Sequence, residues 1–226
     1  MRIVVDENIS FASEAFSGLG EVILLPGRSI TNQHLINADA LITRSVTKVD
    51  EKLLDNTSVR FVGTATIGTD HIDAKLLASK NISFRDAAGC NADAVTEYVF
   101  TSIFTTAARY NIDLSGLKLG VIGAGNIGSR VTRLGKVLGL NVFANDPPLK
   151  RRTGSNDYKD LNELLDADII TLHVPLNMGG LDNTFHLFDE KILSSLKDGC
   201  IIINASRGEV VDNKVLNEFV LKKKFL

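Results

Sequence analysis

Hydrophobic and polar positions follow two alternating patterns along this chain. Short apolar runs, such as Arg2–Asp6, end in a polar residue, and segments with helical spacing, such as Ile72–Lys80, separate them. Apolar runs of this length are typical of strands buried on both faces, and their alternation with helices is typical of βαβ units. The pattern therefore predicts an α/β protein built on parallel sheets.

The predicted strands fall into two series. Each strand is bounded by turn residues or by a helical segment, and each is short enough to cross one sheet. We expect strands of the first series within residues 2–6, 21–27, 38–44, 60–66 and 81–86, and strands of the second within 117–125, 140–146, 161–175 and 200–206.

A long helical segment separates the two series. Within Ala92–Tyr110, apolar residues recur at four-residue spacing, at Val95, Val99, Ile103 and Ala107. A helix of this kind is a plausible junction between domains. We predict a first domain over residues 1–95 and a second over residues 96–226.

Composition narrows the class of partner. The chain has 226 residues, is 44% hydrophobic and has a formal net charge of −2, so it has no basic excess for a nucleic-acid backbone. No apolar stretch reaches the roughly 18 residues of a membrane span, and "MRIVVDENIS" reads as a strand rather than a signal peptide. Two cysteines and four scattered histidines indicate neither a disulfide framework nor a metal site. We expect a cytoplasmic protein.

A glycine-rich motif opens the second series. Gly123, Gly125 and Gly128 form G-x-G-x-x-G after a predicted strand and at the start of a predicted helix. In this context the first glycine permits a tight turn, the second lets the backbone approach a pyrophosphate, and the third allows close packing of helix on strand. The motif predicts a dinucleotide site at the helix N-terminus.

An acidic residue follows at the end of the next predicted strand. Asp146 lies where a carboxylate bonds the hydroxyls of the adenosine ribose in dinucleotide-binding domains. A carboxylate there repels a 2′-phosphate, so the sequence favours NAD over NADP.

Two further polar residues follow strand ends, where ligands of open α/β sheets bind. His173 is compatible with a catalytic role or with lining the cofactor groove, and we favour the second. Arg207 is a poor general acid, because guanidinium keeps its proton at neutral pH. Its guanidinium can form a bidentate hydrogen bond to a carboxylate or polarise a carbonyl. An arginine on an ordinary surface turn fits the sequence equally well.

Two loops of the first domain are rich in glycine and hydroxyl residues. Residues 43–48 and 63–73 each follow a predicted strand, and their backbone N–H groups are compatible with an anion-binding nest or with ordinary turns. Arg44 and Lys48 fit either an anion site or solvated loop charges.

Taken together, these features resemble the D-2-hydroxyacid dehydrogenase family, and most closely its members that oxidise 4-phospho-D-erythronate. The resemblance spans almost the whole chain. It rests on segments that occur in the same order and spacing: "VDEN", "PGR", "RSVTKV", "FVGTATIGTDHID", "GCNADAVTEYV", "GAGNIGSR", "DPP" and "NASRGEVVDN".

The resemblance implies a fold and a set of roles. It implies a flavodoxin-like substrate domain, a Rossmann NAD-binding domain, NAD as cofactor and a small phosphorylated 2-hydroxy acid as substrate, with no nucleic acid, membrane or metal involved. Arg207 matches the catalytic arginine. The substrate-binding positions are Ser45, Thr66, Ile67 and Gly68, and the cofactor-binding positions are Gly123, Gly125, Asn126, Ile127, Gly128, Asp146, Val174, Pro175, Asn204, Ala205 and Ser206.

The implied reaction is oxidation of 4-phospho-D-erythronate to a 2-oxo acid in pyridoxal 5′-phosphate biosynthesis. The family's catalytic histidine and its glutamate partner lie beyond the arginine motif, and none of the four histidines here matches that position. We expect the second domain to be incomplete on its C-terminal side, the family's dimerisation region to be missing, and the chain to have little or no dehydrogenase activity. The alternatives are a non-catalytic NAD-binding remnant and a dehydrogenase of another D-2-hydroxy acid.

Overall fold

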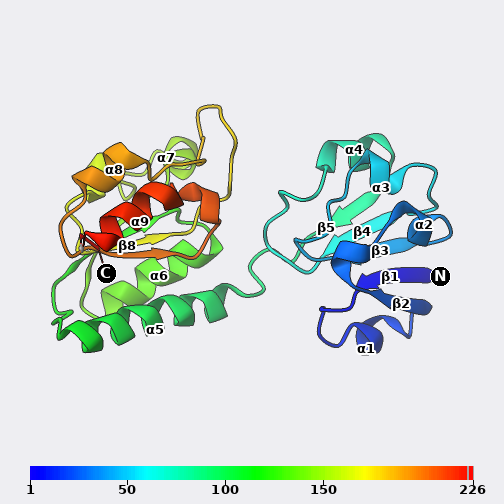
Figure 1. Cartoon of the computed structure of the whole chain (residues 1–226), viewed down its shortest axis with the longest axis horizontal. Helices are drawn as coiled ribbons and strands as arrows, with labels where there is room; N and C mark the ends of the chain where they lie inside the picture. Colours follow the sequence, from blue (N-terminus) through cyan, green and yellow to red (C-terminus); the bar gives the residue numbers. More distant parts are fainter. Residues whose placement is uncertain (223, 226) are drawn as a thin grey trace. The chain divides into compact units, whose positions relative to one another are not determined.

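The protein consists of two compact units in a computed structural model that describes residues 1–222, 224 and 225 (Figure 1). Unit 1 covers Met1–Cys90 and unit 2 covers Asn91–Leu226. The predicted domain boundary after residue 95 lies inside helix α5, Ala92–Tyr110, which begins unit 2.

Unit 1 contains a five-stranded parallel sheet in the order β2-β1-β3-β4-β5. This is the flavodoxin-like order, so the expected doubly wound architecture is confirmed. Its strands are the predicted apolar runs, and β1 and β3 in the middle are almost fully buried. The strands are β1 Arg2–Asp6, β2 Glu21–Leu25, β3 Ala40–Thr43, β4 Phe61–Thr64 and β5 Ser83–Arg85.

The helices of unit 1 are short and are fixed by polar caps and apolar contacts. Asp50 and Asp73 each accept a hydrogen bond from a backbone N–H in the first turn of the helix that follows. One face of the sheet packs around Leu41 and Val62, and the other around Ile3 and Val5. The helices are α1 Ala12–Phe16, η1 Gly27–Ser29, α2 Asn32–Leu35, α3 Glu51–Leu54 and α4 Ala74–Ser79.

Unit 2 contains a four-stranded parallel sheet in the order β7-β6-β8-β9. Single-residue bridges extend it, with Tyr158 beside Ala144 of β7 and Phe225 beside Cys200 just before β9. With these bridges included, the order corresponds to 3-2-1-4-5-6, the Rossmann arrangement. The strands are β6 Lys118–Ile122, β7 Asn141–Asn145, β8 Ile169–Leu172 and β9 Ile201–Asn204.

The helices of unit 2 cover this sheet. Val99 and Ile103 of α5 pack with Val131 of α6 against Leu119 and Ile169, so the apolar stripe predicted in α5 is buried. Within the described residues, no helix is both long and apolar enough to span a membrane. The helices are α5 Ala92–Tyr110, α6 Asn126–Val137, α7 Pro147–Thr153, η2 Leu161–Leu164, α8 Glu190–Ser195, η3 Gly208–Val210 and α9 Asn213–Leu221.

Helix α7 begins almost directly after β7, at two consecutive prolines, Pro147 and Pro148. The two prolines occupy the first positions of a helix, with Asp146 as its N-cap. Proline is tolerated there because the first N–H groups of a helix have no partner inside it. The same residues therefore end β7 and start α7.

Candidate functional site

The glycine motif forms a tight turn between β6 and α6. Gly123 has φ +89°, and a Cβ placed on it would lie 2.7 Å from the carbonyl oxygen of His173. A Cβ on Gly128 would lie 1.8 Å from the carbonyl oxygen of Gly123. Any larger residue at either position would therefore collide with backbone atoms, which fixes the close approach of helix, turn and neighbouring strand.

The middle glycine has a different environment. Gly125 is the N-cap of α6, and a Cβ built on it would meet no atom within 4 Å. The packing of the chain therefore does not require a glycine at this position. An exposed backbone at a helix N-terminus is the arrangement that lets a phosphate approach N–H groups closely.

Asp146 connects the end of β7 to the glycine turn. Its Oδ2 accepts a hydrogen bond from the N–H of Ala124 at 2.8 Å, and its Oδ1 accepts one from the N–H of Leu149 at 2.9 Å. A carboxylate has about four acceptor positions, so each oxygen can accept a further hydrogen bond. The side chain is thus held in place and can still accept from two neighbouring hydroxyls.

A cavity of about 280 Å³ lies beside this turn at the carboxyl edge of the sheet. This volume is close to the lower end of the roughly 300–1,000 Å³ of small-molecule pockets. Its walls come from the glycine turn, the start of α7, and the segment that follows β8. The lining residues are Ile122, Gly123, Gly125, Asn145, Asp146, Pro147, Pro148, Leu161, His173, Val174, Pro175, Asn177, Leu181, Asp182, Asn183, Thr184 and Leu187.

His173 contributes to the cavity wall directly after β8. Its Nε2 lies 2.9 Å from Oγ1 of Thr171, and its Nδ1 has no hydrogen-bond partner among the described residues. Burial lowers the pKa of His173 to about 4, so the imidazole is neutral at physiological pH. A partly buried, neutral ring fits a role in lining the groove better than one in proton transfer near neutral pH.

The segment after β9 is a turn organised by Asn204. Oδ1 of Asn204 accepts hydrogen bonds from the N–H and the hydroxyl of Ser206, and its Nδ2 donates to the carbonyl of Arg207 at 2.8 Å. Arg207 is partly buried and precedes η3 in an extended conformation. Asn204, Ala205, Ser206 and Arg207 therefore lie at the carboxyl end of the strand next to β8.

In unit 1, the loop after β4 contains a network of hydroxyl groups. Oγ1 of Thr66 lies 2.8 Å from Oγ1 of Thr64 and donates to the carbonyl of Gly68 at 3.2 Å. Oγ1 of Thr64 also lies 3.2 Å from Nε2 of His71, which is buried. These contacts fold residues 64–71, including Ile67, into a compact loop at the end of the strand.

Ser45 occupies the equivalent place after the neighbouring strand. Thr43 and Thr64 are register partners in β3 and β4, so Ser45 and Thr66 follow the same edge of the sheet at the same spacing. Ser45 and Arg44 are exposed, and Lys48 forms an ion pair with Asp50 at 3.4 Å. For Lys48, the pairing favours a solvated loop charge over an anion site.

The structure brings part of the predicted cofactor set together. Gly123, Gly125, Asp146, Val174 and Pro175 line the cavity. Asn126, Ile127 and Gly128 form the first turn of α6 outside that lining, and Asn204 to Arg207 lie at the end of β9. All of them follow strands of one parallel sheet at its carboxyl edge.

The segment between β8 and α8 forms a wall of the cavity that the sequence patterns did not predict. Asn177, Leu181, Asp182, Asn183 and Thr184 all belong to it. A signal was present, because a long connection that follows a strand at the ligand edge of an open sheet often carries binding residues.

The donor set of unit 2 fits a dinucleotide. Gly125 leaves the backbone uncovered at a helix N-terminus, and Asp146 offers acceptors to vicinal hydroxyls. Within the described part of the chain, no cluster of His, Cys, Asp and Glu is arranged to hold a metal ion.

Comparison with family models is consistent with this geometry. Residues 90–225 match the model described as D-isomer specific 2-hydroxyacid dehydrogenase, NAD binding domain. Residues 7–118 match the catalytic domain model of the same description.

Curated relatives extend the comparison to individual proteins. The chain is 49% identical over 217 residues to erythronate-4-phosphate dehydrogenase of Escherichia coli O7:K1, and 48% identical to that of Salmonella paratyphi B. In both cases 96% of this chain is matched, and it spans 57% of the length of the relative.

Solved structures show the same fold. D-lactate dehydrogenase from Aquifex aeolicus, complexed with NAD and lactic acid, is 27% identical with a TM-score of 0.79, over 100% of this chain and 74% of that one. The NAD⁺-bound 3-phosphoglycerate dehydrogenase of Entamoeba histolytica is 24% identical with a TM-score of 0.81, over 100% and 78%.

Proposed function

The chain belongs to the D-isomer-specific 2-hydroxyacid dehydrogenase family, and from this premise we propose that it serves the NAD-dependent oxidation of 4-phospho-D-erythronate to the 2-oxo acid. The observation that carries the substrate assignment is the 49% identity to enzymes named erythronate-4-phosphate dehydrogenase. Because the chain spans 57% of their length, the proposal concerns the binding steps that its own residues can perform.

The proposed cofactor site is the glycine turn with its adjoining cavity. The nicotinamide of NAD, when bound, supplies the acceptor for the hydride that leaves C2. The N–H groups of Asn126 and Ile127, at the start of α6, hold the pyrophosphate, and Gly128 keeps this helix close to the turn. Asp146 accepts hydrogen bonds from the ribose hydroxyls, while Val174 and Pro175 exclude water from one wall of the groove.

Arg207 is proposed to bind the carboxylate of the substrate and polarise its C2 oxygen. Its planar guanidinium presents parallel N–H donors that match a carboxylate, and its charge stabilises negative charge on an oxygen. The hydrogen bond from Asn204 to the carbonyl of Arg207 orients this turn. Asn204, Ala205 and Ser206 are proposed to lie near the nicotinamide.

In unit 1, the hydroxyls of Ser45 and Thr66 are proposed to contact the substrate. The backbone at Ile67 and Gly68 is proposed to hold its carboxylate, because successive N–H groups in such a loop form an anion-binding nest. The contacts of Thr66 with Thr64 and Gly68 support this role, since they hold the loop in one conformation.

We further propose that this reaction belongs to pyridoxal 5′-phosphate biosynthesis in the cytoplasm. The pathway rests on the resemblance to the erythronate-4-phosphate enzymes. The compartment is supported by two free cysteines, Cys90 and Cys200, since thiols persist in reducing environments.

The proposal is tested by separating binding from turnover. Calorimetry measures NAD⁺ binding to the purified chain, and thermal shifts compare 4-phospho-D-erythronate with D-lactate and 3-phospho-D-glycerate. Formation of NADH is then followed at 340 nm. Arg207→Lys is the matched variant, because it keeps the charge and removes the bidentate fork.

We expect NAD⁺ to bind, and 4-phospho-D-erythronate to shift the unfolding midpoint more than the other acids do. Arg207→Lys should reduce that shift and leave NAD⁺ binding intact. NAD⁺ binding with no response to any acid would favour the non-catalytic alternative. A stronger response to another 2-hydroxy acid would favour the alternative substrate.

A further inference from the structure

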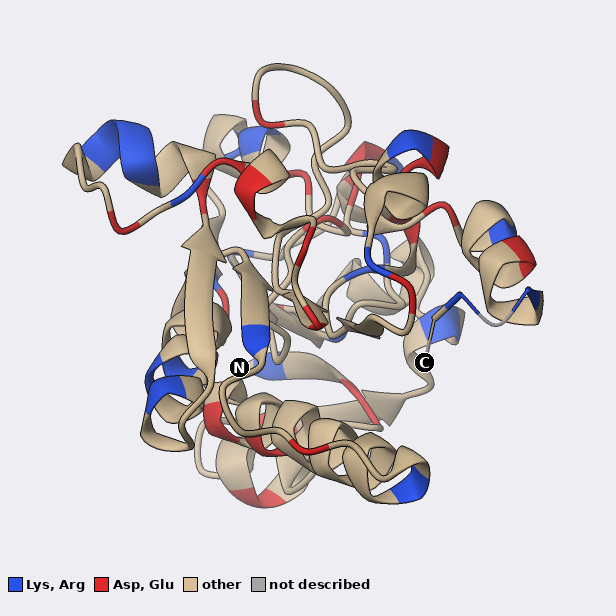
Figure 2. Cartoon of the chain, turned by 90° about the vertical axis from the view of Figure 1, so that its left-hand side faces the viewer, with Lys and Arg blue, Asp and Glu red and all other residues tan. Residues whose placement is uncertain are grey.

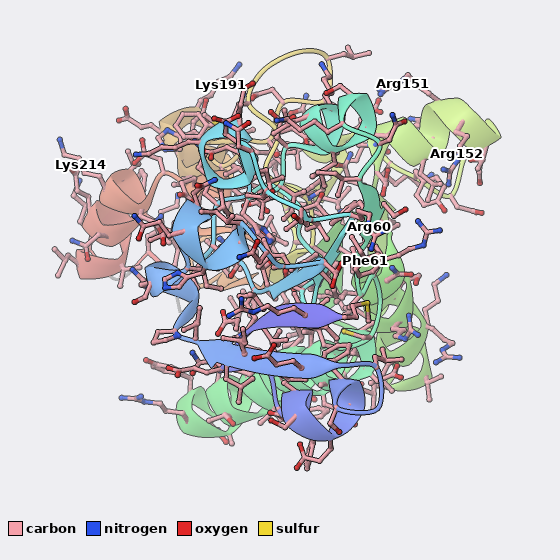
Figure 3. All side chains as sticks on the ribbon, turned by 90° about the vertical axis from the view of Figure 1, so that its right-hand side faces the viewer. Arg60, Phe61, Arg151, Arg152, Lys191 and Lys214 are labelled. Atoms are coloured by element: carbon pink, nitrogen blue, oxygen red, sulfur yellow. The ribbon has the colours of Figure 1, made fainter. Side chains whose placement is uncertain are left out.

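The cavity of unit 2 carries an unusual distribution of charge. Its lining includes two carboxylates, Asp146 and Asp182, and none of the described lining residues is Lys or Arg. Three cations nevertheless lie close by, because Lys150, Arg151 and Arg152 follow one another on α7, which starts at the cavity wall. Lys and Arg residues are blue in Figure 2, and Figure 3 labels Arg151 and Arg152.

Two of these three cations are bound to carboxylates. Nη2 of Arg151 lies 2.5 Å from Oδ1 of Asp182, across from α7 on the segment that follows β8. Nζ of Lys150 lies 2.8 Å from Oδ1 of Asp160, which does not line the cavity. Arg151 is therefore paired with a carboxylate that belongs to the lining of the cavity.

The segment that carries Asp182 is itself fixed by hydrogen bonds. Nδ2 of Asn177 donates to the carbonyl of Asp182 at 3.0 Å, and Oγ1 of Thr184 donates to the carbonyl of Pro175. The N–H of Gly179 donates to Oδ1 of Asn183. The acceptor that holds Arg151 is thus positioned by the fold of its own loop.

The position of this ion pair bears on the choice between two dinucleotides. In dinucleotide-binding domains the carboxylate at the place of Asp146 bonds the ribose 2′-hydroxyl, and an arginine near it accommodates a 2′-phosphate. Arg151 lies five residues after Asp146 on the helix that Asp146 caps, so it is the kind of residue that a 2′-phosphate requires. Its guanidinium already binds a carboxylate.

We propose that Asp182 is a specificity-determining residue that favours NAD over NADP by sequestering Arg151. The inference rests on the proposed function, because it requires that the cavity bind the adenosine ribose. Asp146 disfavours a 2′-phosphate by charge repulsion, and Asp182 removes the arginine that would offset that repulsion.

The size of the effect follows from the exposure of the pair. The side chains of Arg151 and Asp182 are 46% and 37% exposed, so water screens their attraction and a phosphate can compete for the arginine. Removing Asp182 should therefore improve NADP⁺ affinity by about two- to fivefold. Removing Asp146 should have a larger effect, because its charge lies at the ribose position itself.

The test is calorimetry with NAD⁺ and NADP⁺ in an Asp146→Ser background, which removes the carboxylate charge that repels a 2′-phosphate. The informative variant adds Asp182→Asn, and a triple variant adds Arg151→Ala as well. The matched control adds Asp160→Asn instead, which removes the carboxylate partner of Lys150 on the same helix. Thermal unfolding midpoints establish that each variant is folded.

We expect Asp182→Asn to tighten NADP⁺ binding about two- to fivefold, with little change for NAD⁺, and Arg151→Ala to abolish that gain. A gain that persists without Arg151, or that Asp160→Asn reproduces, would overturn the inference in favour of a general charge effect. Unchanged NADP⁺ affinity together with normal NAD⁺ binding would contradict this inference alone. No NAD⁺ binding by the unaltered chain would contradict the proposed function as well.

Discussion

The carboxylate of Asp146 accepts a hydrogen bond from the backbone N–H of Ala124, with 2.8 Å between Oδ2 and the nitrogen. Ala124 is the second residue of the glycine motif, and Asp146 follows the neighbouring strand β7. The bond therefore joins two features that lie 22 residues apart in the chain. It holds the turn and the carboxylate that is proposed to bind the ribose in a fixed relation.

Replacing Asp146 by Ala is expected to lower both stability and NAD⁺ affinity. The change leaves the N–H groups of Ala124 and Leu149 without their acceptor and removes the N-cap of α7. Loss of an N-cap costs about 1–2 kcal/mol, and loss of a hydrogen bond to a charged group should weaken NAD⁺ binding about tenfold or more. Denaturant unfolding and calorimetry measure the two effects. NAD⁺ affinity equal to that of the unaltered chain would remove Asp146 from the site.

Two glycines of the motif should respond differently to replacement by alanine. Gly128→Ala places a methyl group 1.8 Å from a backbone oxygen and should destabilise unit 2 by about 1–3 kcal/mol. The methyl group added by Gly125→Ala has no atom within 4 Å, so this change should alter the stability of unit 2 by less than about 1 kcal/mol. It should nevertheless weaken NAD⁺ binding about tenfold, because the methyl group occupies the approach of the pyrophosphate. Equal stability losses in the two variants would contradict this division of roles.

His173 should make the stability of unit 2 depend on pH. Its pKa is about 4 in the folded chain, against 6.5 for an ordinary histidine side chain, so the unfolded chain binds more protons between these values. Stability is therefore full above pH 6.5 and falls as pH drops toward 4, by about 2 kcal/mol between pH 7 and pH 5. Urea unfolding at both pH values measures this loss. His173→Gln cannot titrate, and the same loss in that variant would assign the effect to other groups.

The two cysteines should differ in reactivity. Cys90 is exposed, whereas Cys200 is buried, and burial raises the pKa of Cys200 to about 12. The thiolate is the reactive form, so a chromogenic disulfide reagent should modify one thiol in the native chain and two after unfolding in denaturant. Cys90→Ser should abolish the native reaction, and Cys200→Ser should leave it unchanged. Rapid modification of Cys200 in the native chain would indicate that the region beside β9 opens readily.

Local patterns in the sequence were sufficient to predict the strands and much of the candidate site. Apolar runs such as Ala40–Thr43 predict buried strands, because helices cover both faces of a parallel sheet and the side chains on both faces of a strand are then buried. The glycine motif predicts a turn because only glycine fits the backbone at Gly123. The sequence pattern does not predict helix α7, because the effect of its two N-terminal prolines depends on the capping carboxylate of Asp146.

The sequence by itself determined the alternation of strands and helices, the dinucleotide turn and the acidic residue after β7, since each depends on neighbours within a few residues. Tertiary structure alone decided that the segment after β8 forms a cavity wall, that His173 is partly buried and neutral, and that Arg151 is held by Asp182. Arg151 and Asp182 are 31 residues apart in the chain. Their pairing arises only when the sheet brings the two strand ends together, and no local pattern records it.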